Sequence, residues 1–129
     1  MKKGFTLLEL IVVIIILGIL ATLGFSQYAK MIEKSRISEA KMILGQIRAA
    51  QAAYKVEYNS YTATMANLPV EVNTYCDSEH YFSYSTDDNT AKAQRCGGGG
   101  KTPNYTGTSY NVIVGFQPGT FSGSTAGYY

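Results

Sequence analysis

The sequence predicts an α+β fold: a long N-terminal α-helix packed against a small antiparallel β-sheet. Three observations support this class. No proline occurs before position 69, most large aliphatic residues lie in the first 25 positions, and the second half is rich in Gly, Ser, Thr and Tyr. A chain of 129 residues is long enough for one small domain with a single core.

The charge balance excludes partners that need a strong electrostatic field. The chain has 11 Lys+Arg and 9 Asp+Glu, and its net charge of +2 equals the contribution of Lys2 and Lys3. Binding of nucleic acid usually depends on a strongly basic surface. DNA is therefore not an expected partner of this near-neutral chain.

The first element is an apolar helical segment. Residues 5–25 read FTLLELIVVIIILGILATLGF, and residues 10–29 carry no charge, which is about the length needed to cross a hydrocarbon core. Lys2 and Lys3 precede it and favour a cytoplasmic N-terminus. A secretory signal peptide fits less well, because the apolar run is long and the best small-x-small site is Thr22 and Gly24. A plain membrane anchor and a helix that later leaves the membrane remain as alternatives.

Glu9 bears on those alternatives because it lies inside the apolar run. A carboxylate in the bilayer core costs a few kcal/mol and usually has a partner and a function. It can also lie at the membrane edge and reach the headgroups. Glu9 alone is compatible with either interpretation.

The residues around Glu9 form a specific pattern. The run KKGFTLLE at residues 2–9 resembles the processing signal of type IV prepilins and of type II secretion pseudopilins, and the resemblance extends to residue 25. It implies that a dedicated peptidase cuts after Gly4 and methylates the new N-terminus at Phe5. It also makes Glu9 the acidic fifth residue of the mature chain, which guides assembly. Ser26 is a departure, because many family members have a proline there.

The resemblance implies three parts of the chain. Residues 1–4 are a leader that is removed on maturation. Residues 5–29 are the half of the helix that spans the membrane and later forms the filament core. Residues 30–129 are the globular head, which includes the amphipathic half of the helix.

The helix is expected to continue from residue 5 to residue 58, over roughly 80 Å. In its second half, apolar residues recur at three- and four-residue steps and form one face of an amphipathic helix. This face consists of Ala40, Ile43, Ile47, Ala50 and Tyr54, widened by Leu44 and Tyr58.

The remaining elements are short. Residues 63–68 are expected to form a helical turn before Pro69. Alternating or β-rich segments predict strands at 81–85, 90–95 and 110–116, with a turn at 86–89. The sheet should have three or four strands and cover the helix face between Ala40 and Tyr54. The tail, residues 117–129, is either an edge strand or a loosely held end.

Two cysteines bracket the first hairpin. Because the chain carries an export or membrane signal, Cys76 and Cys96 are expected to form a disulfide, with two free buried thiols as the alternative. Closing this loop would stabilise the head by about 3 kcal/mol in the chain-entropy model.

Catalytic and metal-binding patterns are scarce, and no enzyme activity is expected. His80 is the only histidine, and no nucleophile motif accompanies it. Four acidic residues offer oxygen ligands that suit calcium, but their spacing is not that of an EF-hand, so a solvated acidic loop is favoured and no cofactor is expected. These residues are Asp77, Glu79, Asp87 and Asp88.

The favoured function is that of a prepilin, the structural subunit of a type IV pilus-like filament. The alternative is a pseudopilin of a type II secretion system, and a competence-type DNA-uptake pilin is less favoured. The resemblance implies as partners further copies of the chain, a prepilin peptidase, an inner-membrane assembly platform and, before assembly, membrane lipid. No small-molecule substrate is expected. The chain would lie in the inner membrane first, and then in an extracellular filament or a periplasmic pseudopilus.

Overall fold

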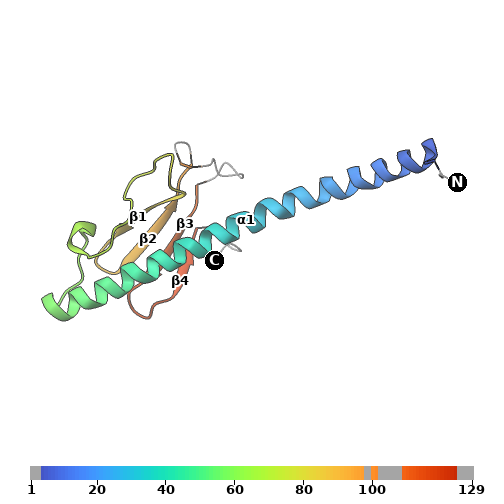
Figure 1. Cartoon of the computed structure of the whole chain (residues 1–129). Helices are drawn as coiled ribbons and strands as arrows, with labels where there is room; N and C mark the ends of the chain where they lie inside the picture. The colour runs from blue at the N-terminus through green and yellow to red at the C-terminus, as the bar shows by residue number, and fades with distance from the viewer. Residues whose placement is uncertain (1–3, 98–99, 102–108, 125–129) are drawn as a thin grey trace. The chain divides into compact units, whose positions relative to one another are not determined.

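The computed structural model describes residues 4–97, 100–101 and 109–124. Figure 1 shows a long helix and a β-sheet, which confirms the predicted α+β class. The chain divides into two compact units, residues 1–33 and 34–129, and each is described by itself. The elements are α1 (Leu7–Tyr58), the 3₁₀ helix η1 (Met65–Asn67), and the strands β1 (Phe82–Thr86), β2 (Thr90–Arg95), β3 (Asn111–Gly115) and β4 (Phe121–Gly123).

The bounds of α1 follow from local chemistry. The helix begins at Leu7, two residues later than expected, because Thr6 occupies the N-cap position. It ends at Tyr58, and the next residue, Asn59, has a φ of 58°. After glycine, asparagine is the residue that most readily adopts this left-handed conformation at a helix end.

The sheet is antiparallel throughout, in the order β1-β2-β3-β4. Tyr84 pairs with Ala93, Ala93 with Val112, and Val112 with Gly123, so these residues form one row across the sheet. The strand at 90–95 matches its prediction, and the other two differ from theirs by one residue at each end. The tail contributes the edge strand β4, and residues 125–129 lie outside the described part.

The core of the second unit lies between α1 and the sheet. The helix contributes Ile37, Ala40, Leu44 and Ile47, each no more than 1% exposed. The small side chains of Ala91 and Ala93 face them from β2, while larger residues come from β1 and β3. In Figure 1 this part of α1 runs beside the strands. The other buried apolar residues include Phe82, Tyr84, Tyr110, Val112, Val114 and Phe116.

The predicted helix face was wrong at its C-terminal end. Tyr58 is 57% exposed and stacks on Tyr54 with ring centroids 4.4 Å apart, because the helix ends there and the chain turns away. Gln51, which the apolar pattern did not include, is fully buried.

Gln51 fixes the chain reversal that follows α1. Its side-chain amide donates to the carbonyl of Thr62 at 2.6 Å and to Oγ1 of Thr86 at 2.8 Å. Its amide oxygen accepts the Thr62 N–H at 3.0 Å. A buried amide that satisfies a distant backbone group in this way is costly to remove. The contact joins the helix, the connector and the end of β1.

Candidate functional site: the apolar helix segment and the disulfide-closed loop

The apolar segment of α1, residues 7–25, has large hydrophobic side chains on every side. Their exposed fractions range from 41% for Ile11 to 76% for Leu7, and Phe5 just before the helix is 83% exposed. A helix that is apolar all round belongs in lipid or among other apolar helices. By length and composition, α1 can cross a membrane.

The start of α1 combines a cap with a carboxylate. The backbone N–H of Glu9 donates to Oγ1 of Thr6 at 3.3 Å, and Leu10 N–H donates to the Thr6 carbonyl at 3.3 Å. Thr6 and Glu9 thus occupy the N-cap and N3 positions that define a capping-box sequence. The side chain of Glu9 is exposed. From Gly4 onward, in the part of the chain that is described, no cation pairs with it.

Gly4 and Phe5 precede the helix in an exposed, non-helical stretch. A Cβ atom at Gly4 would meet nothing within 4 Å, and among the described glycines only Gly119 has a positive φ. The described residues therefore give no steric reason for a glycine at position 4.

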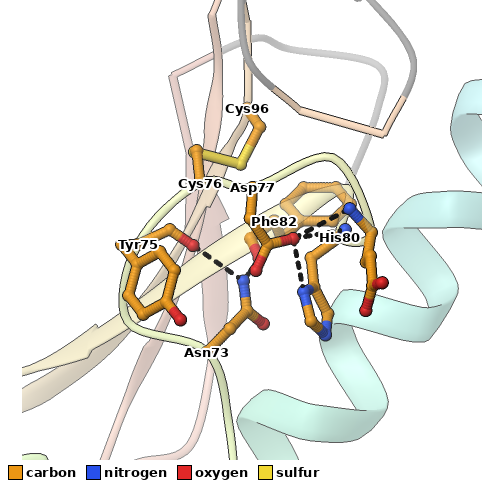
Figure 2. Close-up of polar contacts among 8 residues, drawn as sticks. Asn73, Tyr75, Cys76, Asp77, His80, Phe82 and Cys96 are labelled. Atoms are coloured by element: carbon orange, nitrogen blue, oxygen red, sulfur yellow. Dashed lines mark hydrogen bonds and ion pairs between the residues drawn. A yellow bond between two sulfur atoms is a disulfide. The ribbon is translucent and has the colours of Figure 1, made fainter.

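The head is closed by a disulfide between Cys76 and Cys96, which are 20 residues apart (Figure 2). The bond ties the segment before β1 to the residue directly after β2. Asn73 fixes the same segment to the outer edge of β1. Its side-chain amide donates to the backbone carbonyl of Phe82 at 2.6 Å and to that of Tyr75 at 3.0 Å. The backbone carbonyl of Asn73 accepts the Tyr84 N–H at 2.9 Å.

Two of the four carboxylates considered as calcium ligands, Asp77 and Asp87, accept hydrogen bonds within turns. Oδ1 of Asp77 accepts the N–H groups of Glu79 and His80 at 2.9 and 3.0 Å, and lies 2.7 Å from Nδ1 of His80 (Figure 2). These hydrogen bonds, first that of the His80 ring and then that of Glu79, lower the pKa of Asp77. His80 is half exposed and caps this turn.

Asp87 plays the same part in the β1–β2 turn. Its Oδ1 accepts the N–H groups of Asn89 and Thr90 at 2.8 and 2.7 Å, and its Oδ2 accepts the Thr90 hydroxyl at 2.8 Å. Burial alone would raise the pKa of Asp87, but these hydrogen bonds outweigh it and lower the pKa. Within the described ranges, no three His, Cys, Asp or Glu side chains gather as metal ligands would.

Arg95 is a buried cation that the sequence interpretation missed. It is 0% exposed, and its Nη1 donates to the carbonyls of Tyr81 and Cys96 at 3.1 and 2.9 Å. Its guanidinium also lies 5.4 Å from the centre of the Tyr81 ring. The strict alternation in β2, with Ala91 and Ala93 facing inward, was the signal that placed Arg95 on the inner face.

Two family models match the chain. Residues 38–123 match the family described as Type IV pilin-like G and H, and residues 1–25 match the prokaryotic N-terminal methylation motif. The first match covers most of the second unit, and the second covers residues 1–4 and the apolar segment. The two matches thus correspond to two regions that differ in exposure and composition.

Curated relatives share part of the chain. It is 44% identical over 50 residues to the type IV major fimbrial protein FimA of Dichelobacter nodosus, covering 39% of this chain and 32% of that protein. It is 37% identical over 67 residues to type II secretion system core protein G of Pseudomonas aeruginosa, covering 52% and 47%. It is 34% identical over 77 residues to the type IV major pilin PilA of Myxococcus xanthus, covering 57% and 35%. In each comparison the chain spans less than half of the relative.

Proposed function

Because the chain belongs to the family of type IV pilin-like G and H proteins, we propose that it is a structural subunit of a type IV pilus-like filament. The observation that carries the proposal is the exposure of the apolar segment. Every large apolar side chain of residues 7–25 is at least 41% exposed. Such a surface is stable only in lipid or against other apolar helices. Polymerisation would supply the apolar contacts that the single chain lacks.

We propose that the chain matures by cleavage between Gly4 and Phe5, followed by methylation of the Phe5 amine. The methylation motif in residues 1–25 and the exposed, non-helical position of both residues support this step. A prepilin peptidase is the implied partner, and residues 1–4 are the leader. A Cβ at Gly4 would meet nothing within 4 Å among the described residues, which fits recognition of this glycine by that enzyme.

Glu9 is proposed to guide assembly. After cleavage the Phe5 amine is a cation on an apolar helix, and Glu9 is the acid nearest to it in sequence. In a packed bundle of apolar helices their attraction is much larger than in water. Pairing within one chain or between neighbours would leave neither charge buried alone.

The proposed route passes through two environments. Residues 5–29 hold the subunit in the inner membrane, and an assembly platform there moves it from lipid into the growing filament. The heads, residues 30–129, then form the outer layer around the packed helices. The role is structural and involves no catalytic step and no cofactor.

A second candidate is a pseudopilin of a type II secretion system. The similarity to core protein G favours this candidate. That match covers 47% of core protein G, whereas the matches to the two pilins cover 32% and 35% of their lengths. In that role the same polymer would be periplasmic. The near-neutral charge favours neither candidate and gives no support to DNA uptake.

The test is to shear surface filaments from cells that produce the protein, image them by electron microscopy and weigh the intact subunit. We expect filaments whose subunit lacks Met1–Gly4 and carries one methyl group. A subunit recovered only in the cell envelope, together with loss of protein secretion on deletion, would favour the pseudopilin. A mature chain that starts near Phe25 would contradict both candidates and indicate a secretory signal peptide.

A further inference from the structure

The two cysteines of the disulfide lie in different surroundings. Cys96 directly follows β2 and is 1% exposed, whereas Cys76 is exposed and lies in the irregular segment that precedes β1. Figure 2 shows the bond joining the loop that carries Cys76 to Cys96. The disulfide therefore has one cysteine on the surface of the head and one in its interior.

The surroundings of Cys96 are closed. Its N–H donates to the carbonyl of Tyr81 at 2.9 Å, which continues the pairing of β1 with β2 by one residue. Its carbonyl accepts a hydrogen bond from Nη1 of the buried Arg95 at 2.9 Å. The chain also passes close to Cys96 at Gly100, where an added Cβ atom would collide with Cβ of Cys96. Another molecule cannot reach Cys96 without local opening of the head.

The surroundings of Cys76 are open. Within the described part of the chain no hydrogen bond to Cys76 is found, and its neighbour Tyr75 is 68% exposed. The segment is held instead by Asn73 on one side and by the turn at Asp77 on the other. An open groove of about 540 Å³ is lined in part by residues 70–74, just before Cys76. A partner molecule can therefore approach this cysteine without displacing any part of the core.

Thiol–disulfide exchange depends on which of the two sulfur atoms can be reached. An attacking thiolate approaches one sulfur in line with the S–S bond and expels the other sulfur as a thiolate. Attack on Sγ of Cys96 would have to come from the interior of the head, whereas attack on Sγ of Cys76 can come from solvent. Formation of the bond passes through the same mixed disulfide in the opposite direction, so the same cysteine is used.

We propose that Cys76 is the exchange-active cysteine of this protein and that it forms a mixed disulfide with a thiol–disulfide oxidoreductase of an oxidising compartment. The Cys76 thiolate attacks one sulfur of the oxidoreductase's disulfide, and the other sulfur of that disulfide leaves as a thiolate. The Cys96 thiolate then attacks Sγ of Cys76 and expels the oxidoreductase. The two cysteines lose two electrons and two protons, and the disulfide of the oxidoreductase is reduced to a dithiol.

The roles of the two cysteines are thus unequal. Cys76 carries the partner, and Cys96 closes the bond from within the folded head. The inference goes beyond the proposed function, because it concerns maturation of the head and does not depend on filament assembly. Failure to form filaments would leave it intact, and an unreactive Cys76 would leave the proposed function intact.

The folded wild-type protein provides the first test. The full chain in detergent is treated with an excess of reduced glutathione, quenched with acid, unfolded, alkylated at its free thiols and mapped by mass spectrometry. We expect glutathione on Cys76 and the alkyl group on Cys96, in at least about tenfold excess over the opposite arrangement. Glutathione mainly on Cys96, equally on both cysteines, or on neither would overturn the inference.

A matched pair of variants tests formation of the bond in cells that produce the protein. Cys96→Ala leaves Cys76 as the only thiol of the chain, and Cys76→Ala leaves Cys96. Because both variants lack the disulfide, the loss of that cross-link is common to both. Cys96→Ala should accumulate at least about tenfold more mixed disulfide with an oxidoreductase than Cys76→Ala. Non-reducing gels measure the adduct, and mass spectrometry identifies the attached protein.

The folded state of the two variants decides how equal adducts are interpreted. Near-UV circular dichroism of the purified variants shows whether each head has kept its tertiary structure. Equal adducts from two folded heads would overturn the inference, because Cys96 would then be as reactive as Cys76. If both heads are unfolded, burial no longer distinguishes the cysteines, and the glutathione reaction of the folded wild-type chain gives the decision.

Discussion

The two halves of α1 differ in whether their apolar side chains are buried within the chain. In residues 34–58 one face is buried by the sheet, and Ala40, Leu44 and Ile47 are 0% exposed. In residues 7–25 no side chain is buried, and the apolar surface surrounds the helix. The head half is thus stabilised within its own chain, whereas the apolar half requires lipid or other subunits.

The difference separates stability from assembly. Substitutions in the head half should change the free energy of unfolding of the head, because they remove contacts within the subunit. Substitutions in the apolar half should leave that free energy unchanged and affect assembly instead. Substitutions in the two halves therefore test this separation.

The largest effect is expected for Glu9→Ala. In the proposed assembly, a subunit that leaves lipid with its Phe5 amine unpaired buries a charge at a cost of several kcal/mol. We expect filament yield to fall to almost nothing while processed subunit accumulates in the membrane, as measured by immunoblots of sheared and membrane fractions. Glu71→Ala, which removes an exposed carboxylate outside the helix, is the control and should assemble normally. Normal filaments from Glu9→Ala would place Glu9 at the membrane edge with no role in pairing.

A pair of leucines compares the two halves directly. Leu44 is 0% exposed in the core, and Leu17 is 58% exposed in the apolar segment. Leu44→Ala should lower the free energy of unfolding of the head by about 2–5 kcal/mol. Leu17→Ala should leave it unchanged. Urea unfolding of the full chain in detergent, followed by near-UV circular dichroism of the head tyrosines, measures both. Equal losses from the two variants would mean that the halves are not independent.

The disulfide is expected to stabilise only the head. Replacing both Cys76 and Cys96 by Ala opens a loop of 20 residues and should cost about 3 kcal/mol of head stability. The far-UV signal of α1 should remain, because residues 7–25 do not depend on the bond. Peptide mapping under non-reducing conditions verifies the link in the wild-type chain. Two free thiols in protein taken from the cell envelope would contradict the compartment assigned to the head.

The smallest effect concerns pH and the β1–β2 turn. The folded state lowers the pKa of Asp87, so its ionised form stabilises the head above the unfolded pKa of about 4. That contribution is lost as the pH falls through the lowered value. Asp87→Ala should therefore cost about 1 kcal/mol at neutral pH, and the difference from wild type should shrink below about pH 4. Asp88→Ala in the same turn should show neither effect, since no hydrogen bond to its side chain is found in the described part of the chain. Thermal unfolding across this pH range measures the difference.

Local pattern predicted most of the architecture. The apolar run, the proline-free stretch and the alternation at 90–95 gave the helix and the second strand almost to the residue. The helix end was predictable, because Asn59 terminates α1 through its own backbone preference. The start was missed by two residues, because the capping role of Thr6 depends on a single hydrogen bond that the apolar pattern does not contain.

The residues that were missed depend on distant partners. Gln51 looks like a solvent-facing helix residue, but Thr62 and Thr86 lie 11 and 35 residues away and meet its amide only after the chain has folded. Tyr58 looks like a continuation of the buried face, but it is 57% exposed. Hydrogen bonding of buried polar groups is a property of the folded neighbourhood and not of the periodicity of one helix.

The sequence by itself determined where the chain is apolar, where the leader pattern lies, and which segments are helix or strand. The helices and strands follow from the spacing of apolar residues. Residues two apart lie on one face of a strand, and residues three or four apart lie on one face of a helix. Only the tertiary structure decided which faces remain open. The sheet covers one face of residues 34–58 and the register of β2 takes Arg95 inward, whereas Met42 and Val56 on the helix stay exposed. The reason is that burial is set by what packs against a residue, and those partners come from strands tens of residues away in the sequence.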